Sequence, residues 1–229
     1  MSDAEPLERR PPAPISDLFA TAVHRFGRAW ADLVVSTAVA LAFGTVPVLV
    51  AAWSGAETPV LFITGAVSYG VAYFALLAQV VLRGLPSPPH RGQRVGAFLT
   101  AVPVGVLAGA IVLQLLWFSI VALPLLLFAV PSVAAGDQAP LRAIPRGAML
   151  AIRTFNRTWG VWVITVLFSG PVVVSMFLIV SSFAGPVGSS MAALALAAPI
   201  VWPFSALFIR ALYGDLTGRL VVAPQDRTR

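Results

Sequence analysis

The stretch VGAFLTAVPVGVLAGAIVLQLLWFSIVALPLLLFAVPSVAAG, residues 95–136, decides the fold because it holds about 42 residues without one charged side chain. A helix needs about 20 apolar residues to cross the roughly 30 Å hydrocarbon layer of a membrane. The stretch is therefore too long for one crossing and has the length of two, with a tight turn expected near residues 114–118. Two alternatives for this stretch stay open: it crosses the membrane once, or it crosses once and continues into a re-entrant segment.

Similar uncharged runs lie on both sides of this stretch. None of them alternates polar and apolar residues, as the strands of a membrane barrel do, so each is predicted to be a helix. The expected fold class is an all-α polytopic membrane protein with six transmembrane helices plus two cytoplasmic interfacial amphipathic helices. The six spans are predicted at residues 33–53, 60–82, 95–114, 116–135, 159–184 and 191–213.

The composition argues against a water-soluble enzyme. Of the 229 residues, 59% are hydrophobic and 10% are charged, whereas soluble domains have roughly 45–50% apolar and about 25% charged residues. The chain has no cysteine and only two histidines, so we expect no disulfide, no metal site and no cofactor. The predicted membrane domain is residues 15–213, between a disordered tail at 1–14 and a cytoplasmic tail at 214–229.

The fifteen basic residues are all arginines and fall into four groups along the chain. The groups precede the first predicted span, separate the second from the third, separate the fourth from the fifth, and lie at or after the end of the sixth. Six spans place every group on one side of the membrane, which the positive-inside rule makes cytoplasmic. A single crossing over residues 95–136 would move the last two groups to the other side. We therefore expect both termini in the cytoplasm.

Two amphipathic segments, residues 15–30 and 141–158, each precede a predicted span. Apolar side chains recur in both at spacings of three and four, which is typical of a helix that lies in the membrane interface. Arginines lie away from these apolar stripes, where they would contact anionic lipid headgroups. The candidate headgroup contacts are Arg25, Arg28, Arg142, Arg146, Arg153 and Arg157. The alternative is that these arginines only set the topology.

The two segments also resemble each other. Residues 22–30 and 151–159 share one spacing of five residue types: Ala, Val or Ile, Phe, Arg and Trp. Nine positions are too few to separate an internal duplication from chance or from shared interfacial composition, so both interpretations stay open. A duplication would give a parallel repeat, because four predicted spans lie between the copies.

Residues 125–163 read LLLFAVPSVAAGDQAPLRAIPRGAMLAIRTFNRTWGVWV, and residues 15–33 read ISDLFATAVHRFGRAWADL. This layout resembles the bacterial polytopic family that includes the membrane domain of glycerophosphoryl diester phosphodiesterases. The resemblance implies a six-helix membrane domain and a loose association with lipid metabolism or envelope integrity. It implies no catalytic residue, because hydrolysis in that family belongs to a separate soluble domain. In that family an acidic residue often follows the Pro segment, whereas here Ala134-Ala135-Gly136 precede Asp137.

Charged residues are absent from the interiors of the predicted spans, so no buried acid or histidine is available there for proton-coupled transport. At the predicted membrane boundary, the candidate ion pair joins Asp32 or Asp215 to Arg210. Gly105 and Gly109 form a G-x-x-x-G pattern, which allows close contact between helices and is expected to act within this chain.

These features predict a non-enzymatic protein of a bacterial cytoplasmic (inner) membrane. The expected role is accessory: lipid handling, envelope maintenance or scaffolding of a partner. The expected partners are membrane lipids, especially anionic lipids of the inner leaflet, and either a second copy of the chain or another membrane protein. No nucleic-acid partner is expected, because the arginine groups follow the membrane topology.

Two other functions stay open. A small transporter or channel subunit would use proline-broken helices and would need a polar cavity at Tyr73, Gln79 or Gln114. An enzyme acting on lipids would need its polar residues to converge in one cleft at the interface. Those residues would be His24, Asp32 and Asp215.

Overall fold

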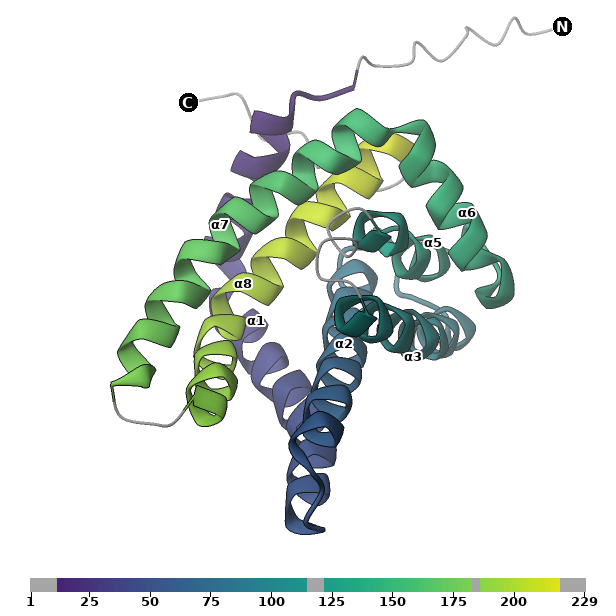
Figure 1. The fold of residues 1–229 in the computed structure, drawn as a ribbon. Helices are drawn as coiled ribbons and strands as arrows, with labels where there is room; N and C mark the ends of the chain where they lie inside the picture. Colours follow the sequence, from purple (N-terminus) through teal and green to yellow (C-terminus); the bar gives the residue numbers. More distant parts are fainter. Residues whose placement is uncertain (1–11, 115–121, 183–185, 219–229) are drawn as a thin grey trace, which may run out of the picture.

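The computed structural model describes residues 12–114, 122–182 and 186–218, and every regular element in this part is a helix. The predicted all-α class is therefore confirmed for the described residues. Figure 1 shows the labelled helices. They are α1 (Ile15–Trp53), α2 (Thr58–Leu82), α3 (Arg91–Gln114), α5 (Ala129–Ala134), α6 (Pro140–Arg153), α7 (Phe155–Ser181) and α8 (Pro186–Thr217). Residues 122–126 are also helical.

Five helices are long and apolar enough to cross a membrane: α1, α2, α3, α7 and the Leu196–Thr217 part of α8. The sixth span, predicted at residues 116–135, is not confirmed. Its described part is a shorter apolar helix, Ala122–Ala134, which a turn interrupts at residues 127–128. At 1.5 Å per residue this part extends roughly 20 Å, which is less than the hydrocarbon layer. The turn expected near residues 114–118 falls almost wholly outside the described residues.

The chain doubles back between α3 and α6. A Cβ atom built on Gly96, in the second turn of α3, would lie 3.2 Å from Val133 Cγ1 near the end of α5. The same atom would lie 3.5 Å from Pro140 Cγ at the start of α6. The end of α5 therefore lies beside the start of α3, so the arginine-bearing links that flank residues 95–136 lie at the same end of the helix bundle.

The first amphipathic segment and the first span form one long helix, α1. This helix departs from helical geometry at Ala29, where φ is −120° and ψ is 18°. The kink lies within one residue of the boundary expected at residue 30. The buried side of the part before the kink is formed by Leu18 and Ala22, whereas Trp30, the last residue of the predicted amphipathic segment, is 59% exposed.

The second amphipathic segment ends earlier than predicted. α6 ends at Arg153 and α7 begins at Phe155, so the interfacial helix does not continue to residue 158. Thr154 makes the break, with φ −111° and ψ 31°, and its Oγ1 donates a hydrogen bond to the Leu150 carbonyl oxygen. Such back-bonding from a threonine hydroxyl bends helices. The two similar segments therefore bend at non-equivalent positions, Ala29 in α1 and Thr154 between α6 and α7.

α2 and α3 cross at glycines. A Cβ atom on Gly105 would lie 2.4 Å from Val71 Cα, and one on Gly109 would lie 2.8 Å from the Ala66 carbonyl oxygen. On the α2 side, a Cβ atom on Gly70 would lie 2.5 Å from the Gly105 carbonyl oxygen. Any side chain at these positions would force the two backbones apart. The G-x-x-x-G pattern thus packs α3 against α2 within the chain, as predicted.

The C-terminal half of α8 lies in the core of the bundle. Phe208, Leu212 and Tyr213 are at most 2% exposed, and the rings of Phe19 and Phe208 meet edge to face, which joins α1 to α8. α7 runs alongside α8 (Figure 1) and buries few of its side chains. Its apolar surface therefore points outward, as expected for a helix that faces lipid.

Candidate functional site

Polar side chains from distant parts of the chain meet at one end of the bundle, which we call the polar end. It contains the starts of α1, α3 and α7, the ends of α2 and α8, and the link between α5 and α6. Hydrogen bonds from Arg210 to Gly84 and from Tyr213 to Asp137 connect these elements. Each of the four arginine groups has a member here: Arg25, Arg83, Arg157 and Arg210.

An ion pair joins the first turn of α7 to the last turn of α8. Arg157 Nη1 donates to Asp215 Oδ2 at 2.6 Å, and the two side chains are 21% and 17% exposed. Arg157 Nη2 also donates to the Ala13 carbonyl oxygen, and the Ala13 N–H donates to Asp215 Oδ1 at 3.0 Å. These three bonds form a closed ring. Arg157, expected to contact headgroups, is therefore engaged in holding the chain together.

This arrangement corrects the candidate ion pair of the sequence analysis. Asp215 is bound by Arg157 and not by Arg210, which instead donates to the Gly84 carbonyl oxygen at 2.9 Å. Asp32 is exposed on α1 and forms no ion pair within the described part of the chain. Helical periodicity predicts a lipid contact for Arg157 because it carries no information on a partner in α8.

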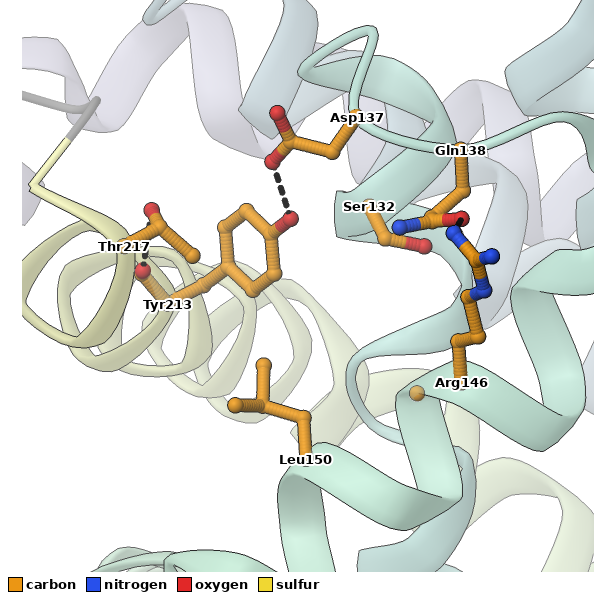
Figure 2. A pocket seen from close by; sticks show the side chains of 8 residues that line it. Ser132, Asp137, Gln138, Arg146, Leu150, Tyr213 and Thr217 are labelled. Atoms are coloured by element: carbon orange, nitrogen blue, oxygen red, sulfur yellow. Dashed lines mark hydrogen bonds between the residues drawn. The ribbon is translucent and has the colours of Figure 1, made fainter.

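A cavity of about 410 Å³ opens at the polar end between α5, α6 and α8. Figure 2 shows the Tyr213 hydroxyl, which donates to Asp137 Oδ2 at 2.5 Å on one side of this cavity. On the other side, Arg146 Nη1 donates to Gln138 Oε1 at 2.7 Å. The lining is completed by Ser132, Gly147, Leu150 and Thr217. The lining of the cavity thus combines a guanidinium, a carboxylate and hydroxyls.

The exposed surface of α6 is both basic and apolar. Its small residues form the buried side: Ala143, Gly147 and Ala151. Its three arginines before the break at Thr154 are exposed: Arg142, Arg146 and Arg153. Three of its large apolar side chains are also exposed, Leu141, Met149 and Ile152, whereas Ile144 and Leu150 pack against the core. A helix with this surface favours the boundary between water and lipid, where the guanidiniums meet headgroups and the apolar side chains meet acyl chains.

The remaining candidate residues lie on α1. Arg28 is exposed, as a headgroup contact would be, whereas Arg25 is half-buried. His24 and Asp32 are exposed, and neither shares a hydrogen bond with Asp215 in the described part of the chain. Among the residues described, no group of three or more histidine, aspartate or glutamate side chains is placed to hold a metal ion.

Most hydroxyls of serine and threonine inside the predicted spans bond back to a carbonyl oxygen of their own helix, and two tyrosines, Tyr69 and Tyr73, join helices. The Tyr73 hydroxyl and Ser205 Oγ lie 3.0 Å apart, linking α2 to α8, and the Tyr73 ring meets Trp202 edge to face. Gln79 lines a mainly apolar groove of about 460 Å³ between α1 and α2, which also includes Phe98 of α3. The side chain of Gln114 is outside the described part.

Sequence reasoning missed two residues that complete these contacts, Gly84 and Gln138. A single glycine or glutamine in a loop carries no chemical signal of its own. Their roles depend on Arg210 and Arg146, which reach them from other elements. In the sequence, Tyr213 is only the last residue of the span predicted at 191–213, and its position beside Asp137 depends on the return of the chain after α3.

Comparison of the chain with known protein families, with curated proteins and with solved structures gives no match. The functional interpretation therefore rests on the geometry and chemistry of the polar end.

Proposed function

We propose that this protein is a non-enzymatic integral membrane protein that binds anionic lipid headgroups at its polar end. Its proposed role is accessory, in lipid handling, envelope maintenance or the scaffolding of a partner. The membrane in this proposal is the cytoplasmic membrane of a bacterium, and anionic inner-leaflet lipids are the partners. The proposal includes kinship with the membrane-domain family that residues 15–33 and 125–163 resemble.

The observation that carries this proposal is the surface of α6. Exposed arginines stand beside exposed Leu141, Met149 and Ile152, and the helix is too short to cross a membrane. A helix in the plane of the interface satisfies both kinds of side chain at once. Each arginine near an anionic leaflet contributes about 1 kcal/mol to binding.

The proposed topology has six crossings, with both termini and the polar end in the cytoplasm. The position of Val133 beside Gly96 supports it, because the chain must return after α3 for these residues to meet. The placement of all arginine groups on one side then follows the positive-inside rule.

The transporter alternative has less support. Pro47, Pro103 and Pro171 lie inside continuous helices, so these prolines do not break the helices into half-spans. Tyr73 packs against α8 through its bond to Ser205, and the groove at Gln79 is mainly apolar. A transport pathway needs polar groups that line a water-filled route.

Retention of anionic lipid by the purified protein in detergent tests the proposal. The variant R142Q/R153Q removes two exposed guanidiniums of α6 that form no hydrogen bond in the described structure. At about 1 kcal/mol for each arginine, phosphatidylglycerol should bind roughly thirtyfold more weakly. Bound phosphatidylglycerol is measured by mass spectrometry of the intact complex.

The matched control is R91Q/R94Q, which removes two exposed arginines from the start of α3. Because α3 is long enough to cross the membrane, its axis would cross the interface instead of lying in it, so this variant should retain more lipid than R142Q/R153Q. Equal losses in both variants would show that net charge alone governs retention, and unchanged retention in R142Q/R153Q would refute headgroup binding by α6.

A further inference from the structure

Two half-buried arginines on different helices interact electrostatically at the polar end. Arg25 belongs to the part of α1 before its kink, Arg210 lies near the end of α8, and the charge of Arg25 acts on Arg210. The rings of Phe19 on α1 meet those of Phe204 and Phe208 on α8 edge to face, which holds the two helices together. The packing of α1 on α8 thus holds the two like charges near enough for one to act on the other.

Neither arginine has an acidic partner in the described part of the chain. The ion pair found there joins Arg157 to Asp215, and the Arg25 side chain takes part in no hydrogen bond with the described residues. The nearest acid along α1 after Arg25 is Asp32, which lies beyond the kink and is exposed. The positive charge of the pair is therefore not balanced within the described structure.

The Arg210 guanidinium is held in place by one hydrogen bond, and not all of its N–H donors have a partner in the described residues. Its Nη2 donates to the Gly84 carbonyl oxygen just after α2, where a cation is favoured by the helix dipole. A Cβ atom on Gly84 would lie 1.7 Å from Arg210 Cζ, so the guanidinium rests directly against this backbone. A guanidinium has five N–H donors, and the Nε of Arg210 is buried without a partner.

Burial makes this arrangement costly unless an anion is present. A charged group loses hydration when it is buried, and two like charges repel each other more strongly where water is excluded. Arginine binds phosphate oxygens through short, charge-assisted and often bidentate hydrogen bonds. Basic sites between transmembrane helices on the cytoplasmic side bind the head groups of anionic lipids.

We propose that Arg25 and Arg210 together bind one phosphate group where α1, the end of α2 and α8 meet. The phosphate belongs to an anionic phospholipid or is a free phosphate ion. The lipid form of this site rests on the proposed function, since it is a second headgroup contact at the polar end. The site uses none of the arginines of α6, so the two proposals are tested on different residues.

Thermal unfolding of the full chain in a non-ionic detergent tests this site, with the fluorescence of the six tryptophans as readout. The additives are phosphatidylglycerol, inorganic phosphate, and sodium chloride at the ionic strength of the phosphate. The main variant is R25Q, because Arg25 forms no hydrogen bond whose loss would disturb the fold. The matched control is R91Q, which removes the same charge from an exposed position.

We expect phosphatidylglycerol or inorganic phosphate to raise the Tm of the wild type and of R91Q beyond the effect of sodium chloride. R25Q should need at least a tenfold higher concentration of the same additive for an equal rise in Tm. Without additive, R25Q should unfold at or above the Tm of the wild type, because it lacks the repulsion. R210K, which keeps the charge but not the planar fork, should bind more weakly than the wild type.

Each outcome has a defined meaning. A response to phosphatidylglycerol alone assigns the phosphate to a lipid, and a response to inorganic phosphate alone assigns it to a free ion. The site is refuted if neither additive stabilises the wild type, if R25Q responds as the wild type does, or if R91Q loses as much as R25Q. Unchanged lipid retention in R142Q/R153Q together with a lost phosphate response in R25Q would refute headgroup binding by α6 and leave this site standing.

Discussion

Arg157 Nη1 lies 2.6 Å from Asp215 Oδ2, which ties the first turn of α7 to the last turn of α8. The same guanidinium and carboxylate also hold the backbone of Ala13, so three segments far apart in the sequence are joined by one pair of charges. α7 begins and α8 ends at the polar end, where lipid binding is proposed. We therefore expect this ion pair to stabilise the packing of the helices there.

Removing either partner should destabilise the protein. We expect R157Q and D215N each to lower the free energy of unfolding by about 1–3 kcal/mol, the range for a hydrogen bond to a charged group, reduced by partial exposure. The double variant should lose less than the sum of the two, because the second change removes a group that is already unpaired. Chemical unfolding in detergent measures these values. R153Q, which changes an exposed arginine, is the control, and single variants as stable as R153Q would contradict the prediction.

The crossing of α2 and α3 should tolerate no side chain at Gly105. In G105A the new Cβ atom would lie 2.4 Å from Val71 Cα, so the helices must separate and lose packing along their contact. We expect a marked fall in Tm and early elution or aggregation in size-exclusion chromatography. G92A is the matched control, since a Cβ atom at Gly92 in the same helix meets nothing within 4 Å. A G105A protein with the Tm of G92A would show that the backbones do not touch.

The hydrogen bond between Tyr73 and Ser205 should stabilise the contact of α2 with α8. In bilayer-embedded helices such bonds contribute about 0.6 kcal/mol on average. A double-mutant cycle of Y73F and S205A, measured by unfolding in detergent, should give a coupling energy of about this size. Y69F is a useful comparison, because the Tyr69 hydroxyl bonds to Thr45 of α1 and should show no coupling to S205A. Zero coupling for Tyr73 would mean that the bond does not form.

The return of the chain after α3 should be visible by site-directed labelling. The protein contains no cysteine, so a single introduced thiol reports on one position. A membrane-impermeant maleimide should label S87C and A139C from the same side and E57C from the other. All three positions are exposed. Labelling of S87C and A139C from opposite sides would mean that residues 95–136 cross the membrane once.

Local sequence properties anticipated the class of the fold but not all of its elements. Long uncharged runs identified α1, α2, α3, α7 and α8 because hydropathy depends only on neighbouring residues. The predicted span at 116–135 is not confirmed, since its described part, the helix Ala122–Ala134, is short, interrupted and largely buried. Apolarity alone does not distinguish a segment that faces lipid from one that packs inside the bundle. The interfacial helix expected to reach residue 158 ended at Arg153 because the hydroxyl of Thr154 bonds back to Leu150.

By itself, the sequence determined that the chain is helical and suited to a membrane, and that its arginines cluster between the apolar runs. These properties follow from composition and spacing, which act locally. Only the tertiary structure decided which arginines remain exposed, that Arg157 is bound by Asp215, and that Arg25 and Arg210 lie near each other without an acid in the described residues. The reason is that these pairings join helices distant in sequence, and helix packing, rather than periodicity, brings their side chains together.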